Sequence, residues 1–243
     1  MKMSIFIIAA VSVLTFGACT VRIIDNKEAA GKMVEKTIDV KDFNKLQLDT
    51  YADVVYTVSD TFSVRVKAGE GDMKNLQFEN KDSVLYIDYR SSDNENGRIW
   101  NINFHRNRSC TVYISAPYLE HIGISGSADV TCKDTIAAKD FNVSIAGSGD
   151  VKLKGVKAEA VTFKIAGSGD IDASLCDVAY SKFAIAGSGD MDVNFRDCGE
   201  ASASISGSGD MDFSGTLGSL AQSVAGSGDI KTKKLTLTGN RSK

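Results

Sequence analysis

The chain has 243 residues, with 28 lysines and arginines against 31 aspartates and glutamates, and a formal net charge of −3. This near balance gives no basic excess of the kind that nucleic-acid binding requires, so we expect no nucleic-acid partner. The 22 glycines and single proline suit strands that bend at glycines, and the length allows one elongated domain with a sizeable core.

The first residues of the chain predict a targeting segment. Lys2 precedes an apolar run over residues 5–16, which is too short to span a bilayer. Two small residues stand directly before Cys19, which resembles a bacterial lipobox, although Phe16 replaces the usual aliphatic residue. Lipidation at Cys19 is therefore the leading interpretation, with ordinary secretion or a retained anchor as alternatives.

This interpretation divides the chain into a lipoprotein signal peptide (1–18), a lipidated Cys19 with a tether to residue 36, and one β-helix domain over 37–243. The membrane is then a partner through the anchor at Cys19. No acidic surface-export signal follows Cys19, so we predict an outer-membrane lipoprotein of the cell envelope, with the periplasmic face favoured over the cell surface.

The first half of the domain, residues 37–118, alternates apolar and polar residues irregularly, which indicates short strands. We expect irregular opening rungs or an antiparallel cap, because an open β-helix end exposes unpaired strand edges. The segment 69–72, Gly-Glu-Gly-Asp, is predicted to be a turn or a loop. The apolar alternation is clearest in residues 38–40, 46–48, 64–66, 85–89 and 112–114.

One possible ligand surface lies in this half. Strand alternation after Trp100 places Asn101, Asn103 and His105 on the face opposite the indole. These amide and imidazole groups could recognise a glycan or an acidic partner. The alternative is an ordinary strand with Trp100 in the core and His105 in solvent.

The second half, residues 119–238, is a repeat. A Gly-Ser-Ala-Asp segment and five Gly-Ser-Gly-Asp segments follow one another, and their aspartates are spaced by 21, 20, 20, 20 and 19 positions. A fixed period of this length indicates stacked supersecondary units. The aspartates are Asp129, Asp150, Asp170, Asp190, Asp210 and Asp229.

Apolar residues step by two on both sides of each glycine corner, so each repeat predicts two strands that meet at a bend. Five residues before each aspartate stands Ile or Val, and Val, Ile or Met follows it directly. We therefore predict an all-β fold: a right-handed parallel β-helix with about 20 residues per rung and ~4.8 Å between rungs.

Tandem Gly-Ser-Gly-Asp corners at this spacing, after a lipoprotein-like leader, resemble the auto-transporter adhesin head (GIN) domain family of bacterial envelope proteins. The resemblance covers residues 122–237 specifically and the preceding segment in general character. It implies a β-helix related in shape to pectin lyases, no established enzymatic activity, and an adhesive role.

The sequence also predicts an acidic array on three consecutive rungs. Positions 0 and +2 of a strand point the same way, so six carboxylates should lie together and repel one another. A calcium ion between rungs is one hypothesis, because Ca²⁺ prefers oxygen ligands. The alternative is that each corner aspartate caps its own corner while the others are solvated. The six residues are Asp170, Asp172, Asp190, Asp192, Asp210 and Asp212.

The cysteines leave their pairing open. An envelope location permits disulfides, and a bridge between Cys176 and Cys198 on adjacent rungs is possible. Cys132 falls in an inward column and is expected to be a core residue, and the state of Cys110 is not determined. None of the four shows metal-ligand spacing.

Together these observations predict a non-catalytic envelope lipoprotein that acts as an adhesin or binding scaffold toward a glycan or an envelope or matrix protein. No cofactor is expected apart from the possible calcium. A structural periplasmic protein without an external ligand is the first alternative. A polysaccharide-acting enzyme is the second, although glycoside hydrolysis needs two carboxylates in unlike environments.

Overall fold

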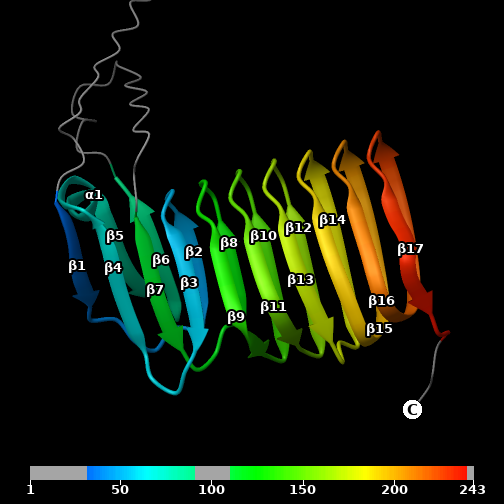
Figure 1. Cartoon of the computed structure of the whole chain (residues 1–243), viewed down its shortest axis with the longest axis horizontal. Coiled ribbons are helices and arrows are strands. Elements are labelled where there is room, and N and C mark those ends of the chain that lie inside the picture. The colour runs from blue at the N-terminus through cyan, green and yellow to red at the C-terminus, as the bar shows by residue number, and fades with distance from the viewer. Residues whose placement is uncertain (1–31, 91–109, 240–243) are drawn as a thin grey trace, which may run out of the picture.

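The computed structural model describes residues 32–90 and 110–239, which form two layers of strands stacked along one axis, with one short helix (Figure 1). Layer 1 contains the strands that precede each glycine corner, and layer 2 those that follow it. The early strands are β1 (Met33–Ile38), β2 (Lys45–Asp49), β3 (Asp53–Val58), β4 (Ser63–Gly69), β5 (Leu76–Lys81), β6 (Val84–Tyr89) and β7 (Thr111–Ala116), with α1 (Glu70–Asn75) before β5.

The repeat supplies the remaining strands. They are β8 (His121–Ile124), β9 (Val130–Ala137), β10 (Asp140–Ile145), β11 (Val151–Lys157), β12 (Ala160–Ile165), β13 (Ile171–Cys176), β14 (Tyr180–Gly187), β15 (Met191–Gly207), β16 (Met211–Gly226) and β17 (Ile230–Leu237). The long strands β15 and β16 contribute to both layers, because each continues past a register shift into residues 200–207 and 219–226. No helix in the described part of the chain is long and apolar enough to cross a membrane.

The parallel register repeats with the period of the sequence. Ile171 pairs with Val151 on one side and Met191 on the other, and Met191 pairs with Met211. The fold is a parallel β-solenoid of about 6 turns with roughly 20 residues per rung, which confirms the predicted β-helix. Its right-handedness remains a prediction.

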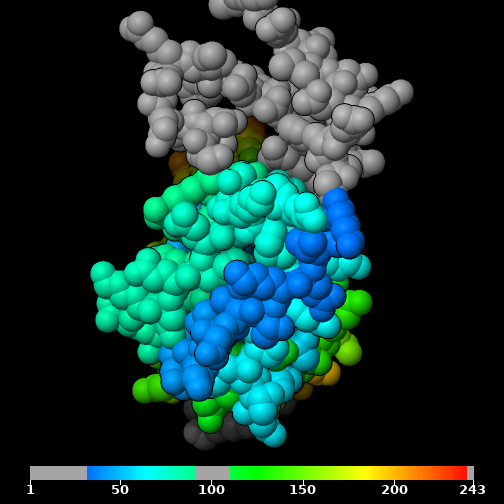
Figure 2. Space-filling model, turned by 90° about the vertical axis from the view of Figure 1, so that its left-hand side faces the viewer, coloured from blue at the N-terminus to red at the C-terminus, as the bar shows by residue number. Residues whose placement is uncertain are grey.

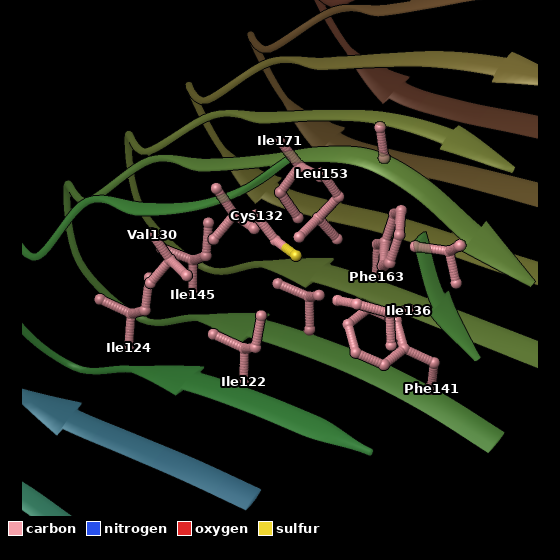
Figure 3. Close-up of a cluster of buried hydrophobic side chains, with 14 of the residues drawn as sticks. Ile122, Ile124, Val130, Cys132, Ile136, Phe141, Ile145, Leu153, Phe163 and Ile171 are labelled. Atoms are coloured by element: carbon pink, nitrogen blue, oxygen red, sulfur yellow. The ribbon is translucent and has the colours of Figure 1, made fainter. Parts of the chain in front are cut away.

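The core lies between the layers and consists of stacked columns. Ile124, Ile145, Ile165, Ile185 and Ile205 form one column and are each at most 2 % exposed. Phenylalanines also stack, with 5.7 Å between the ring centroids of Phe163 and Phe183. Figure 3 shows part of this core, with Ile124, Ile145 and Phe163 from layer 1 and Val130, Leu153 and Ile171 from layer 2 around one shared interior. This apolar burial is the main stabilising contribution to the fold.

The glycine corners stack directly on one another, and this close approach explains the glycine before each aspartate. A Cβ atom at Gly189 would overlap the backbone oxygen of Gly169, and the same relation holds between Gly209 and Gly189. Backbone conformation adds a second requirement at Gly207 and Gly226, whose φ angles are 145° and 142°. The glycines of the corner motif are therefore required by the close packing between rungs as well as by the bend of the chain.

Opening rungs and an antiparallel cap are both present in the first half. Strands β6 and β7 pair in parallel with β2 and β3, which in turn pair with β8 and β9. The rung formed by β2 and β3 thus lies between two later segments of the chain. Strand β4 pairs antiparallel with β7 and β1, and β5 pairs antiparallel with β6. Figure 2 looks at this end, where the blue segment that includes β1 lies across the solenoid.

Two boundary predictions need correction. β1 begins at Met33, so the folded part starts before the predicted boundary at residue 37, because Met33 to Ile38 pair with β4. The segment 69–72 is not a simple turn: Glu70 to Asn75 form α1, with acidic Glu70 and Asp72 in its first turn, where they are favourable toward the helix dipole.

All four described cysteines are free thiols. Cys132 is buried, as predicted for its inward column, and Cys110 and Cys198 are buried too. The possible bridge between Cys176 and Cys198 is not formed. Instead, the Cys176 Sγ atom accepts a hydrogen bond from Arg196 Nε at 3.3 Å.

Candidate functional site: the acidic array

A ladder of hydrogen bonds joins the corners of successive rungs. The Oδ1 atom of each corner aspartate accepts a hydrogen bond from the backbone N–H of the corner aspartate on the next rung. The distances are 3.0 Å for Asp129–Asp150, 3.0 Å for Asp150–Asp170, 2.8 Å for Asp170–Asp190, 2.7 Å for Asp190–Asp210 and 2.9 Å for Asp210–Asp229. We call this set the aspartate ladder.

The ladder corrects the expectation that each corner aspartate caps its own corner. Parallel stacking in register places the amide of the next rung directly above each carboxylate, so the side chain bonds between rungs. Each aspartate keeps its other carboxylate oxygen for a different partner. The Oδ2 atom of Asp210, for example, lies 2.7 Å from Lys231 Nζ.

A second column of aspartates runs beside the ladder in layer 2. Asp172, Asp192 and Asp212 occupy equivalent positions on β13, β15 and β16. Lys152 continues this column at one end and Lys231 at the other. The structure therefore brings all six predicted carboxylates to neighbouring rungs of one surface, and we call them the acidic array.

The electrostatic environment differs along the array. Partial burial raises the pKa of Asp192, and repulsion from Asp172 and Asp212 raises it further. The hydrogen bond from Lys231 instead lowers the pKa of Asp210, and Lys234 Nζ lies 3.5 Å from Asp212 Oδ2. The lysines of β17 thus pair with the two carboxylates of the last rung, whereas Asp192 lies between the like charges of Asp172 and Asp212.

This asymmetry was not expected from six equivalent aspartates, but it lies on an open surface. Asp192 is exposed and Asp210 is half-buried at the surface. A general acid of a glycosidase is usually held in an apolar pocket that raises its pKa substantially. The array does not enclose either carboxylate in this way.

Between the two aspartate columns lies a shallow hollow of about 240 Å³. Buried Val151 and Ile171 underlie it. Its polar lining consists of Asp150, Lys152, Asp170, Asp172, Asp190 and Asp192. Ionised carboxylates accept hydrogen bonds but cannot donate them. A ligand of this hollow must therefore bring hydroxyl, amide or ammonium donors.

In the residues that the structure describes, no three or more His, Cys, Asp or Glu side chains are arranged to hold a metal ion. The six carboxylates form two columns that cross the strands from rung to rung. Their corner members use one oxygen on backbone amides, which leaves fewer free ligand atoms than the sequence suggested. The calcium site remains a hypothesis from the sequence.

Several predicted residues lie outside the described part of the chain. Cys19 falls in residues 1–31, and Asn101, Asn103 and His105 fall in residues 91–109. Lipidation and the possible amide and imidazole surface therefore stay predictions.

A polar cluster beneath α1 was not anticipated. Tyr89 Oη donates a hydrogen bond to Asp72 Oδ1 at 3.1 Å and accepts one from Asn75 Nδ2 at 3.1 Å. The rings of Tyr51 and Tyr89 meet edge to face with centroids 4.8 Å apart, and burial together with Asp72 raises the pKa of Tyr51. The only signal in the sequence was the richness of this half in tyrosines, which gives no pairing.

A family model described as "Putative auto-transporter adhesin, head GIN domain" matches residues 42–234. The chain belongs to this family. The match extends well before the first Gly-Ser-Gly-Asp corner and includes the rung formed by β2 and β3. No curated protein matches the chain.

Solved structures share the fold at low sequence identity. A crystal structure titled "putative adhesin" from Bacteroides fragilis is 19 % identical with a TM-score of 0.60, covering 82 % of this chain and 96 % of that chain. A "putative adhesin" from Parabacteroides distasonis is 19 % identical with a TM-score of 0.52, covering 83 % and 97 %. A "putative lipid binding protein" from the same organism is 18 % identical with a TM-score of 0.55, covering 83 % and 96 %.

Proposed function

We propose that this chain is a non-catalytic binding scaffold of the bacterial cell envelope, anchored by a lipid on Cys19, that holds a polymeric glycan along its acidic array. Membership of an adhesin-head family supports a binding role. The observation that carries the proposal is the pair of aspartate columns that flank one shallow hollow over several rungs. A repeating surface of this kind suits a repeating ligand.

The chemistry of the array favours a donor-rich polymer. Each rung offers carboxylate oxygens as acceptors, and sugar hydroxyl and N-acetyl N–H groups are donors. A single exposed contact of this type contributes little. Contacts on consecutive rungs add up, because a chain held at one rung meets the next at high effective concentration.

The proposed lipid anchor would decide which glycans the acidic array can reach. A lipid on Cys19 would tether the solenoid to the outer membrane, and the periplasmic face would bring the array within reach of peptidoglycan. Display on the cell surface would instead offer it capsular or host glycans. Both ligands carry the required donors.

Co-sedimentation with purified peptidoglycan sacculi tests the proposal. We expect the full chain to pellet with sacculi, and Asp172→Asn/Asp192→Asn to lower the bound fraction about threefold or more, because two rungs lose charged acceptors. The matched control is Asp60→Asn/Asp140→Asn, which removes two exposed carboxylates outside the array. Equal binding of all three proteins would contradict the assignment of the surface.

A chain that stays in the supernatant with sacculi would instead favour a structural envelope protein without such a ligand. A matrix or envelope protein as partner would appear as binding to whole envelope fractions that is lost after protease treatment of those fractions. Binding that disappears after digestion of the glycan supports the proposal.

Lipid binding is a second candidate, favoured by one feature. A hollow of about 220 Å³ lies at the N-terminal end, where Ile38, Met73, Leu76 and Phe78 provide apolar walls and Lys36 a cation. An anionic amphiphile with one acyl chain matches this combination. The test is retention of radiolabelled palmitate by the purified chain, which Leu76→Lys should abolish.

A further inference from the structure

The second aspartate column is flanked by a lysine at each end, and only one of these two lysines is ion-paired. On the C-terminal side, Lys231 Nζ lies 2.7 Å from Asp210 Oδ2. On the other side, Lys152 is in register with Asp172 on the next rung. In the described part of the chain, neither Lys152 nor Asp172 takes part in an ion pair. Two opposite charges on neighbouring rungs are therefore both open to a ligand.

Further lysines stand beside Lys152 on the outer face of layer 2. The residues on either side of Lys152 are buried, so Lys152 and Lys154 share the exposed face of β11. Lys133 is exposed on the preceding rung and follows Cys132, which pairs with Leu153. Among the residues that the structure describes, no ion pair involves Lys133 or Lys154. The surface next to the acidic array thus favours an anionic group.

Lys152 and Asp172 also line the same shallow hollow of about 240 Å³. Neighbouring rungs are ~4.8 Å apart, so a ligand that reaches both side chains must carry an anionic and a cationic group close together. A free α-amino-acid group meets this requirement, because its carboxylate and its ammonium group are bonded to the same carbon atom. A neutral sugar does not.

Asp192 gives a separate reason for a cation in the hollow. Partial burial and the negative charges of Asp172 and Asp212 raise the pKa of Asp192. An ammonium group placed between these carboxylates offsets their repulsion, which a sugar hydroxyl cannot do. It also donates charge-assisted hydrogen bonds, which are stronger than those of neutral donors.

We propose that Lys152, Asp172 and Asp192 form a subsite for a free α-amino-acid group, with Lys152 on its carboxylate and the two aspartates on its ammonium. This subsite rests on the proposed function, because it belongs to the same acidic array and names the part of the polymer that the array recognises. Peptide stems of peptidoglycan that contain a diaminodicarboxylic acid carry such groups. Glycan strands without peptides lack them.

Co-sedimentation of the full chain with three preparations of sacculi tests the subsite. One is unmodified, one is N-acetylated with acetic anhydride, and one is amidated at its carboxyl groups with carbodiimide and excess ammonium chloride. We expect Lys152→Gln to lower the bound fraction about threefold on unmodified sacculi and to match the unchanged chain on amidated sacculi. The loss caused by Asp172→Asn/Asp192→Asn should shrink on N-acetylated sacculi. Lys182→Gln is the matched control, since Lys182 is an exposed lysine on β14, in layer 1.

Failure of the subsite is distinguishable from failure of the proposed function. An unchanged chain that does not pellet with unmodified sacculi contradicts both. If the chain pellets, a Lys152→Gln variant that binds as well as Lys182→Gln overturns the subsite alone, as does a loss that is equal on unmodified and amidated sacculi.

Removal of the peptide stems with an amidase gives a further test. It should abolish the difference between Lys152→Gln and the unchanged chain, and a difference that persists would place the anion on the glycan strand and overturn the subsite. Circular dichroism melting shows whether the variants fold. Because Lys152 is exposed, we expect Lys152→Gln to melt close to the temperature of the unchanged protein.

Discussion

The Oδ1 atom of Asp190 accepts a hydrogen bond from the backbone N–H of Asp210, one rung further along, at 2.7 Å. The same bond recurs between the other corner aspartates. The side chain therefore links successive rungs by a hydrogen bond at the corner, in addition to the strand pairing on either side. This gives each corner aspartate a structural role, which the neighbouring column of Asp172, Asp192 and Asp212 does not share.

The ladder predicts a difference between two substitutions of one residue. Asp190→Ala removes the acceptor for the Asp210 amide and should lower the free energy of unfolding by about 1 kcal/mol. Asp190→Asn keeps an acceptor oxygen and should change stability by much less. Urea denaturation measures both. Equal destabilisation by Ala and Asn would show that the charge, rather than the hydrogen bond, is what matters.

Corner stacking predicts that Gly189→Ala is strongly destabilising. The new Cβ atom would overlap the backbone oxygen of Gly169, and relief requires the rungs to move apart, at a cost of about 2–3 kcal/mol. The matched control is Gly71→Ala in α1, where a Cβ atom meets nothing within 4 Å. That change should stabilise the chain by about 0.5–1 kcal/mol, since alanine is the better helix former.

Asp192 predicts a pH dependence. Its pKa is raised in the folded chain, so the ionised form opposes folding, and stability rises as pH falls through that folded pKa. Asp192→Asn should therefore stabilise the chain at pH 7, by about 0.5 kcal/mol after allowance for solvent screening. The gain should fade toward and below about pH 4, where the carboxyl is protonated in both states.

Thermal melts of this variant at pH 7 and at acid pH measure the effect. Asp140→Asn is the control, because Asp140 faces Ala160 on the next rung rather than another aspartate. A gain that persists unchanged at acid pH would contradict charge repulsion as its cause.

The cysteines predict selective thiol chemistry. Burial raises the pKa of Cys110 to about 12, and it also raises those of Cys132 and Cys198. Cys176 is only half-buried. Brief alkylation of the folded chain at pH 8, followed by peptide mass spectrometry, should label Cys176 well before the other three. Labelling of Cys110 at the same rate would contradict the packing around it.

The sequence of residues 1–19 predicts membrane attachment through a lipid on the sulfur atom of Cys19. Cys19→Ala should move the chain from the membrane fraction to the soluble fraction and abolish incorporation of radiolabelled palmitate. The control is Cys176→Ser, which should leave both readouts unchanged. Membrane retention of the Cys19 variant would point to another anchor.

The period of 20 residues was enough to predict the rungs, the inward columns and the six neighbouring carboxylates, because a repeat carries its own register. It also contained the ladder: an aspartate that recurs once per turn lies directly below the amide of its successor. A prediction made for one corner alone does not include this hydrogen bond, because its donor lies on the next rung.

The arrangement of the first half could not be predicted in the same way, for a physical reason. Residues 37–118 have no repeat and therefore carry no register. The sequence could not predict that the β2–β3 rung lies between the strand pairs β6–β7 and β8–β9. The pairing of Lys234 with Asp212 depends on the register shift between β16 and β17. A shift of that kind is decided by local packing and leaves no periodic trace.

The central claim is that the array binds a glycan without cleaving it, and one measurement addresses both halves. The full chain is incubated with purified peptidoglycan sacculi, the sacculi are pelleted, and pellet and supernatant are analysed for protein and for soluble glycan fragments. We predict protein in the pellet and no release of fragments above the level of untreated sacculi. Protein left in the supernatant would contradict binding, and released fragments would contradict a non-catalytic role.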